Sequence, residues 1–400
     1  MIGDTPRMRW IPGLALALAM TSAACGARTG LLEPDDAALD GGSEAGAPDR
    51  TIRQLSGGYS HGCALRRGGQ VLCWGMNNQG QIGDGTTQDR PTAVYVAGVN
   101  DATRISSGHA FNCAVRSSGK VSCWGARPRP SGESSIQASP VEVDGLERAV
   151  DVAVGSNHTC ALSDDGKVHC WGMGLNGQLG VGIVPFADMP VVVQGISGAT
   201  QVIAGTGYSC AVLADNTIAC WGSNVDHAAG GPIASEPVLV PTKVKGTEGA
   251  RQASSRSSHA CLVSTDGAVR CWGGNFSKKL GFETTWCCSP DAQVVKEVTG
   301  AREVAAGDAH SCARTESGEV WCWGLGMTGE LGNGKTPDSS LAVQVVGLSG
   351  ARHVALGAYH SCAIDASDQV WCWGDNRGMQ LGGATSEDKS TVPVKVPIPK

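Results

Sequence analysis

Short runs of alternating apolar and polar residues follow one another along most of the chain. The run at 301–307 (Ala-Arg-Glu-Val-Ala-Ala-Gly) alternates as a half-buried β-strand does. Two further apolar runs, at 310–314 and 319–323, flank a polar tetrad with a glycine, which is typical of a β-hairpin. A fourth run, rich in proline and valine, follows a loop, as at 393–396. No stretch among these runs keeps a helical period, so the pattern predicts about four short strands in succession and an all-β chain.

This group of strands recurs seven times, with a period near 50 residues. Each copy carries a cysteine, a second cysteine ten positions later and a Trp-Gly pair directly after it, from Trp74-Gly75 to Trp373-Gly374. Such a period is typical of repeat arrays and propellers. Seven four-stranded units suit a ring, because radial closure leaves few exposed sheet edges. We therefore predict a seven-bladed β-propeller over residues 51–400, with about four antiparallel strands in each blade.

The paired cysteines are predicted to form one cross-strand disulfide in each blade. The residue six positions after the first cysteine is glycine in five copies and Asn216 or Asp368 in the others, and all three types tolerate the positive φ of a tight hairpin. A turn there sets the two cysteines opposite each other. A zinc site is disfavoured, because paired zinc ligands usually lie about two to four residues apart; buried reduced thiols are the other alternative. The predicted pairs are Cys63–Cys73, Cys113–Cys123, Cys160–Cys170, Cys210–Cys220, Cys261–Cys271, Cys312–Cys322 and Cys362–Cys372.

Three motifs together resemble the regulator of chromosome condensation repeat family: His-x-Cys-Ala-Leu, Gly-x-Val-x-Cys-Trp-Gly and Gly-Gln-Leu-Gly. The resemblance covers roughly residues 51–400 and implies a seven-bladed β-propeller. Copies two and four depart from the Gly-Gln-Leu-Gly loop, and copy five carries an insertion with Trp286, Cys287 and Cys288. These departures lie in loops, where binding faces usually diverge. Cys287 and Cys288 are expected to bridge each other or a nearby loop, or one of them to pair with another chain.

The N-terminus is typical of an export signal. Arg7 and Arg9 precede an apolar run at 11–20, too short to span a bilayer, and small residues follow up to Cys25. The sequence Ser-Ala-Ala-Cys resembles a bacterial lipobox, so residues 1–24 are predicted to be a signal peptide and Cys25 to be lipidated; cleavage without lipidation is the alternative. Residues 25–50, rich in Gly, Ala, Asp and Glu, are predicted to be a flexible tether. We expect an outer-membrane or cell-surface lipoprotein, or otherwise a periplasmic or secreted protein, in a compartment that permits disulfides.

The candidate chemical residues have structural explanations. A histidine stands two positions before the first cysteine in five copies, and Phe111 and Tyr208 take its place in the other two. One histidine per blade of a ring is too widely spaced for a shared site, so we expect a structural role, such as bonding between blades. No catalytic signature motif is found, and we predict no catalytic residue, metal or cofactor. The net charge of −6 and the absence of a basic stripe argue against nucleic acid. The histidines are His61, His158, His259, His310 and His360.

These features favour a propeller scaffold that binds a protein or glycan partner through its loops. Its only contact with the membrane is expected to be the lipid on Cys25. Trp286, Phe276 and Phe186 are the candidate contact residues. The resemblance implies two alternatives: guanine-nucleotide exchange on a small GTPase, from which export would separate this protein, and inhibition of a secreted enzyme such as a β-lactamase. An enzyme built on propeller loops is a further alternative.

The two ends of the chain are predicted to share one blade. The first copy starts at 51–55 without the proline-and-valine strand that precedes the equivalent run in later copies, and such a strand reappears at 391–396. Sharing a blade would pair both free sheet edges.

Overall fold

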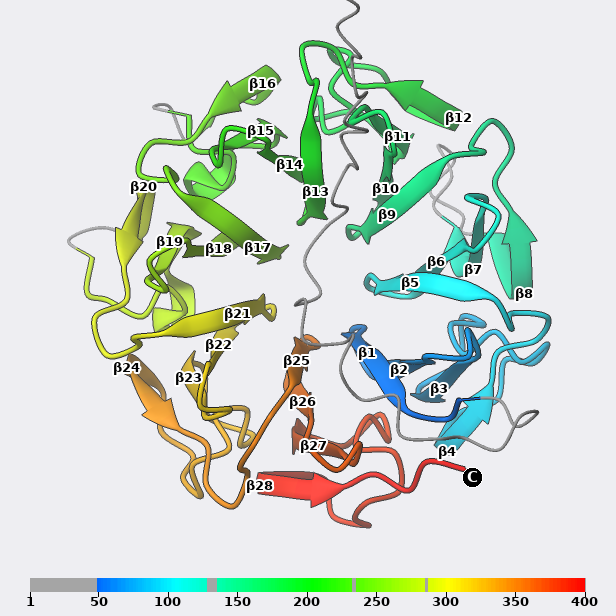
Figure 1. The fold of residues 1–400 in the computed structure, drawn as a ribbon, viewed down its shortest axis with the longest axis vertical. Coiled ribbons are helices and arrows are strands. Elements are labelled where there is room, and N and C mark those ends of the chain that lie inside the picture. The colour runs from blue at the N-terminus through cyan, green and yellow to red at the C-terminus, as the bar shows by residue number, and fades with distance from the viewer. Residues whose placement is uncertain (1–48, 128–134, 232–234, 285–286, 400) are drawn as a thin grey trace, which may run out of the picture.

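Seven four-stranded antiparallel sheets surround a central axis, with the first strand of each sheet innermost (Figure 1). The computed structural model describes residues 49–127, 135–231, 235–284 and 287–399. Each sheet is built from four consecutive strands that pair in chain order. The predicted all-β, seven-bladed propeller is therefore confirmed.

The blades follow the chain around the ring. Blade 1 contains β1 (Ile52–Gly57), β2 (His61–Arg66), β3 (Val71–Gly75) and β4 (Arg90–Tyr95). Blade 2 contains β5 (Ala102–Ser107), β6 (Phe111–Arg116), β7 (Val121–Arg127) and β8 (Ser135–Glu142). Blade 3 contains β9 (Ala149–Val154), β10 (His158–Ser163), β11 (Val168–Met173) and β12 (Phe186–Val192). Blade 4 contains β13 (Ala199–Ala204), β14 (Tyr208–Leu213), β15 (Ile218–Gly222) and β16 (Val238–Lys243).

The remaining three blades have the same plan. Blade 5 contains β17 (Ala250–Arg256), β18 (His259–Ser264), β19 (Val269–Gly274) and β20 (Cys288–Val294). Blade 6 contains β21 (Ala301–Ala306), β22 (His310–Thr315), β23 (Val320–Gly324) and β24 (Ser339–Gln344). Blade 7 contains β25 (His353–Leu356), β26 (His360–Ile364), β27 (Val370–Asp375) and β28 (Lys389–Lys395). Two single 3₁₀ turns, η2 (Val225–His227) and η3 (Phe276–Lys278), lie in the loops of blades 4 and 5. In the described part of the chain, no helix has the length and apolar character needed to cross a bilayer.

The central hairpin of each blade has the predicted turn and the predicted disulfide. All seven turn residues have a positive φ, from 59° at Asn216 to 85° at Gly69. In every blade the two cysteines are directly paired across the hairpin, as Cys160 is with Cys170. Their Cα atoms lie 4.0–4.1 Å apart and their sulfur atoms are bonded, which confirms the seven predicted pairs.

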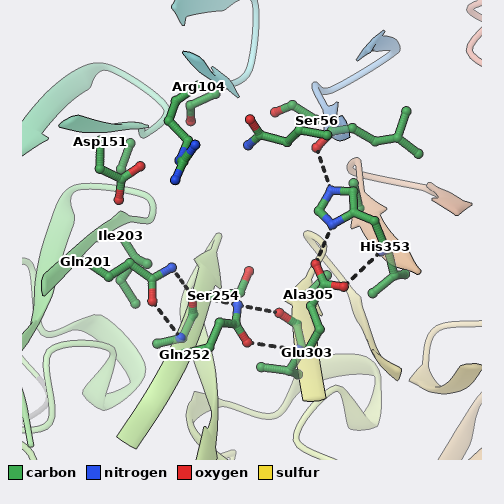
Figure 2. A pocket seen from close by; sticks show the side chains of 18 of the residues that line it. Ser56, Arg104, Asp151, Gln201, Ile203, Gln252, Ser254, Glu303, Ala305 and His353 are labelled. Carbon is green, nitrogen blue, oxygen red and sulfur yellow. Dashed lines mark hydrogen bonds and ion pairs between the residues drawn. The ribbon is translucent and has the colours of Figure 1, made fainter. Parts of the chain in front are cut away.

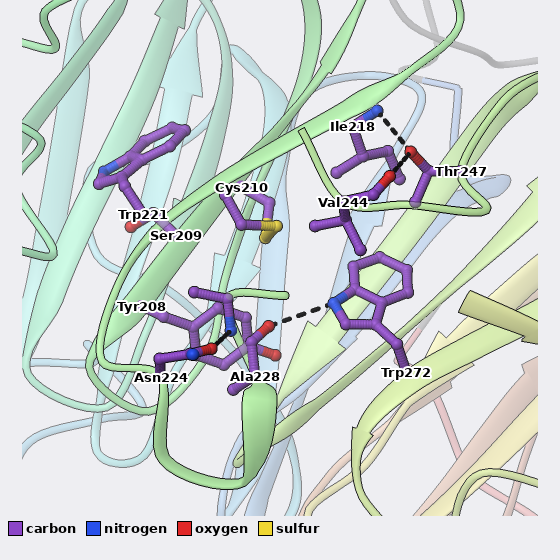
Figure 3. The surroundings of a disulfide bond; sticks show 12 residues. Tyr208, Ser209, Cys210, Ile218, Trp221, Asn224, Ala228, Val244, Thr247 and Trp272 are labelled. Carbon is purple, nitrogen blue, oxygen red and sulfur yellow. Dashed lines mark hydrogen bonds between the residues drawn. A yellow bond between two sulfur atoms is a disulfide. The ribbon is translucent and has the colours of Figure 1, made fainter. Parts of the chain in front are cut away.

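The hydrophobic core lies between neighbouring blades. The apolar side chains divide into seven clusters, each drawn from two adjacent blades. At the centre of each cluster is the tryptophan that follows the second cysteine of a blade. Trp272 of blade 5, for example, packs in one cluster with Cys210, Ala228 and Val244 of blade 4 (Figure 3). Both faces of β2-type and β3-type strands are therefore buried, which explains their nearly continuous apolar sequence.

The prediction that the chain ends share a blade is wrong. The proline-and-valine strand of each copy pairs with the third strand of its own blade, as β4 does with β3, so a copy that starts with its inner strand is complete. The ring closes by packing between two complete blades, β1 and β25 lying side by side (Figure 1). Leu381 and Val396 of blade 7 pack with Trp74 of blade 1, whose Nε1 donates to the Gln380 carbonyl at 2.9 Å. Beyond β28, the Pro399 carbonyl accepts a hydrogen bond from Arg66.

Candidate functional site

The strand register gives the propeller two different faces. The end of β1 pairs with the start of β2 (Gly57 with Gly62), and the start of β2 pairs with the end of β3 (His61 with Gly75). The first and third connections of each blade therefore lie on one face, which we call the loop face. The hairpin turns and the links between blades lie on the opposite face, the turn face. The described chain enters on the turn face, where the Asp49 carbonyl accepts from the Gly68 N–H at 3.1 Å.

Four of the five column histidines bond their blade to the next, which is the structural role predicted for the column. The Nε2 atom of His158 in blade 3 lies 2.7 Å from the Ser209 Oγ of blade 4. Because that hydroxyl donates its own proton to the Gln178 carbonyl, it accepts from a protonated Nε2, and the imidazole is neutral with a bare Nδ1. Burial lowers the pKa of His158 to about 4, so the ring stays neutral near pH 7. Three equivalent pairs are His61 with Asn112, His259 with Ser311 and His310 with Ser361.

The tryptophan column completes the same joint. Trp221 Nε1 donates at 3.0 Å to the Gln178 carbonyl that also accepts from Ser209. This carbonyl belongs to the Gly-Gln-Leu-Gly loop, so the loop motif supplies the hydrogen-bond acceptor that joins two neighbouring blades. In blade 4, where the motif is lost, the Ala228 carbonyl takes over and accepts from Trp272 at 3.2 Å (Figure 3).

A ring of polar side chains ties the inner strands together along the channel wall (Figure 2). Gln252 accepts from the Val304 N–H at 2.9 Å and donates to the carbonyl of the same residue at 3.0 Å, so it binds the next blade as a short strand would. Gln201 binds Ala253 in the same way. The equivalent residues around the ring are Gln54, Arg104, Asp151, Gln201, Gln252, Glu303 and His353.

Glu303 and His353 form the pair in this ring that most resembles an acid–base site. Burial alone would raise the pKa of Glu303, but His353 and Arg314 lower it below its usual value. Burial alone would lower the pKa of His353, but the Glu303 carboxylate, 2.6 Å from its Nδ1, raises it above its usual value. The other ring nitrogen lies 3.2 Å from the Leu55 carbonyl across the closing seam. Both imidazole nitrogens are therefore used in the wall.

Arg256 reaches across the channel at the loop face. Its Nε donates to Asp308 at 2.7 Å, its Nη1 to the Gly57 carbonyl at 2.7 Å and its Nη2 to the Gly108 carbonyl at 3.4 Å. One side chain of blade 5 thus reaches blades 6, 1 and 2. The role of Arg256 was not predicted, although an alignment of the seven copies points to it. Six copies have glycine at the position that Arg256 occupies in blade 5. At Gly307, a Cβ would lie 2.7 Å from the His310 ring, so the histidine column itself requires the glycine.

Aromatic side chains lie on the loop face around the Arg256 side chain. The Tyr59 and His109 rings lie 4.2 Å apart between their centroids, and Tyr59 meets Tyr359 edge-on at 5.8 Å. The three come from the first connections of blades 1, 2 and 7, all on the loop face.

Exposed apolar side chains lie in an arc on the same face. The fourth residue after the tryptophan of the Cys-Trp-Gly motif is apolar in blades 3 to 6 and at least half exposed in each. These residues, which we call the apolar arc, are Leu175 (55% exposed), Val225 (59%), Phe276 (59%) and Met327 (66%). Blades 7 and 1 carry Arg377 and Asn78 there. Single exposed apolar residues are ordinary, but here four consecutive blades each present one at the same position of the loop face.

Of the predicted contact residues, Phe276 therefore lies within the apolar arc. Phe186 starts the outer strand β12, where it is paired with Met173, and it is half-buried. Trp286 and the lipidation candidate Cys25 lie outside the described residues.

Cys287 and Cys288 are not bonded in the structure. Their sulfur atoms lie 2.6 Å apart, so the predicted bridge between them stays a prediction. Asp226, from η2 of the preceding blade, joins them in a group whose ligand atoms all lie within 4.8 Å of one another, a proximity the sequence did not indicate. Burial, and after it the neighbouring Cys287, raises the pKa of Cys288 to about 12.

Comparison with known proteins places these features in a family. Two models of the regulator of chromosome condensation (RCC1) repeat match the chain, one at 52–81, 149–178, 301–326 and 351–378, the other at 68–115, 165–212 and 317–364. Human E3 ubiquitin-protein ligase HERC2 is 40% identical over 77 residues, which are 19% of this chain and 2% of HERC2. The ultraviolet-B receptor UVR8 of Arabidopsis thaliana is 34% identical over 107 residues, 26% of this chain and 24% of UVR8. The chain thus spans only a small part of the length of these relatives.

Two solved structures share the fold. Prp20p from Saccharomyces cerevisiae has a TM-score of 0.70 and 22% identity, with 79% of this chain and 84% of that chain covered. Human WBSCR16 has a TM-score of 0.73 and 20% identity, with 83% of this chain and 95% of that chain covered. At sequence identities this low, the structural similarity establishes a common fold alone.

Proposed function

Because the chain belongs to the regulator of chromosome condensation repeat family, we propose that it is an exported propeller scaffold that binds a protein partner on its loop face. Structures of the yeast relative support a binding role for this fold: Prp20p is described with its binding to Gsp1p and histones, and also in a complex with Kap60. In this chain, Glu303 and His353, the pair in the channel wall that most resembles an acid–base site, are used to join blades.

The apolar arc is the observation that carries the proposal. Phe276 and Met327 are the most prominent members of a surface that also includes Val225 and Leu175. Aromatic residues, methionine and arginine are enriched in protein interfaces, and the same face has tyrosines around its central arginine. An apolar surface of this kind favours a protein partner over a glycan, whose hydroxyl groups would need polar partners.

The position of the chain entry supports the same orientation. The described chain starts at Asp49 on the turn face, and most of the predicted tether, residues 25–50, precedes it in the sequence. A lipid on Cys25 would therefore hold the turn face towards the membrane and leave the loop face turned outwards. Palmitate labelling that marks the wild type and not Cys25→Ser would establish this anchor, whereas equal labelling of both would refute it.

The test compares capture of partner by the full mature chain and by two variants. Phe276→Asp combined with Met327→Asp places two charges in the apolar arc, and we expect it to lower recovery of the wild-type partner from surface fractions at least about tenfold. Val240→Asp is the matched control, since Val240 is 64% exposed but lies on the outer strand β16. Equal recovery by all three proteins would exclude the apolar arc as the binding surface. A small GTPase as the captured partner would favour the exchange alternative.

A further inference from the structure

The cavity along the channel extends to the turn face, and we call its end there, lined by Asp49, Gly166 and Gly318, the mouth. Arg256 crosses the channel at the loop face, bonded to three other blades. The cavity has a volume of about 1840 Å³. Pockets for small molecules usually measure about 300–1,000 Å³, so a single small ligand would leave this cavity largely unfilled. An extended segment of polypeptide is a better match in size.

The mouth is basic on one side. The position directly before the polar wall ring is arginine in four consecutive blades, and none of its seven residues is acidic. The seven are Arg53, Thr103, Val150, Thr200, Arg251, Arg302 and Arg352, and all of them except Thr103 line the cavity.

The ion pairs already present at this mouth are weak enough to exchange. Arg302 pairs with Glu316, and Arg352 with Asp368, between side chains that are about one-third or more exposed. Exposed pairs of this kind contribute about 0–1 kcal/mol, so another carboxylate can replace the partner. On the opposite side of the mouth, Asp164 pairs with Arg148 of the same blade. An acidic ligand would therefore be drawn to the side formed by blades 5, 6, 7 and 1.

A matching acidic segment adjoins this mouth in the sequence. Residues 29–48, which lie outside the described residues, contain five carboxylates and no lysine or arginine. The carboxylates are Glu33, Asp35, Asp36, Asp40 and Glu44. Asp49, the first described residue, lines the cavity, so the segment starts at the mouth. At about 3.3 Å per residue, Asp40 reaches up to about 30 Å from Asp49, and Glu44 up to about 16 Å.

We propose that the mouth of the channel binds the chain's own acidic segment 33–44, through ion pairs between its carboxylates and the arginines at 53, 251, 302 and 352. Attachment at Asp49 gives the segment a millimolar effective concentration, so even a weak site is largely occupied. The docked segment shortens the free tether. This inference is independent of the partner proposed for the loop face.

The test uses a fluorescein-labelled synthetic peptide of residues 29–48 and fluorescence anisotropy at low salt. The acidic segment is neutralised in the full mature chain by Glu33→Gln, Asp35→Asn, Asp36→Asn, Asp40→Asn and Glu44→Gln. We expect this protein to bind the peptide, and the wild type to bind it about tenfold more weakly, because its own segment competes. Adding Arg53→Gln and Arg251→Gln to the neutralised protein should remove the binding, whereas adding Arg148→Gln, a matched exposed arginine outside the mouth, should not.

Three results would overturn the proposal. The neutralised protein could fail to bind the peptide, which would leave no acidic-peptide site. The variant with both mouth substitutions could bind as tightly as the Arg148→Gln control, which would place the site elsewhere. Equal affinity of the wild type and the neutralised protein would exclude the chain's own segment and assign the mouth to an acidic peptide from another molecule.

Discussion

At the scale of the residue, the histidine column depends on an uncharged imidazole. Burial lowers the pKa of His310 to about 3 and that of His61 to about 4. Because the unfolded chain keeps a pKa near 6.5, it binds more protons than the folded protein in this pH range. Folding stability therefore falls as the pH drops below about 6.5, and the loss is complete for each histidine once the pH passes below its folded pKa. Burial raises the pKa of Asp151 to about 6, which opposes this trend at one site.

We predict that His310→Phe reduces the acid sensitivity of the protein. Phe111 holds the equivalent position in blade 2, so a phenyl ring fits the column. Ser361 keeps a partner, since its Oγ donates to the Glu330 carbonyl at 2.9 Å. One buried histidine costs about 1.4 kcal/mol for each pH unit below 6.5, so the wild type should lose about 2 kcal/mol more than the variant between pH 7.5 and pH 5. Denaturant unfolding at both pH values measures the difference, and parallel losses in the two proteins would contradict the prediction.

At the scale of the element, the hairpin with its cross-strand disulfide is the unit that repeats. Cys160 and Cys170 are fully buried and close a loop of about eleven residues around the turn at Gly166. In the chain-entropy model, a loop of this length contributes about 3 kcal/mol by restricting the unfolded chain. The contributions of seven bridges in one coupled ring are not expected to add up.

We expect the double variant Cys160→Ala and Cys170→Ala to fold as a complete ring but to lose up to about 3 kcal/mol, because alanine fits the buried strand pair. Its denaturant midpoint should fall without a change in the pairing of the other six bridges, which non-reducing mass spectrometry would verify. An unchanged midpoint, or free thiols at these positions in exported wild-type protein, would show that the bridge does not stabilise the fold.

At the scale of the whole molecule, the seam between blades 7 and 1 lacks the histidine bond that joins four other pairs of blades. Gly62 stands where three blades have serine, and His360 has no hydrogen-bond partner among the described residues. A side chain at Gly62 would contact the Trp74 ring, with a Cβ only 2.7 Å from it. The apolar packing of this seam follows that of the other seams: Val396, just after the last strand, is buried in the cluster of Trp74, as Val96 is in the cluster of Trp124.

We therefore predict that Val396→Asp destabilises the entire ring, by about 2 kcal/mol or more, because it puts a charge into the cluster that closes the seam. Val392→Asp is the matched control, since Val392 lies on β28 of the same blade and is 39% exposed. Thermal unfolding should show one transition at a lower temperature for the first variant and little change for the second. If both melted at the wild-type temperature, closure would not depend on the chain end.

The repeat, the strands, the turn positions and the opposed cysteines could all be predicted from the sequence. These are local features: the hairpin partners lie ten residues apart, and a turn residue such as Gly166 or Asn216 sets the register between them. The histidine column could also be assigned a structural role, because its spacing around a ring excludes a shared site.

Which outer strand belongs to which blade, and how the ring closes, is seen only in the three-dimensional structure. A proline-and-valine strand between two inner runs has the right pattern for either neighbouring blade, and only the pairing of β4 with β3 distinguishes the two. Arg256 reaches Gly57, 199 residues away in the sequence, and Asp226 meets a cysteine pair from the following blade. A periodic pattern indicates which side of a strand is buried. The contacts between residues of distant blades depend instead on how seven blades meet around the axis. Closure of the ring brings together residues that lie far apart in the sequence, and no local pattern indicates such contacts.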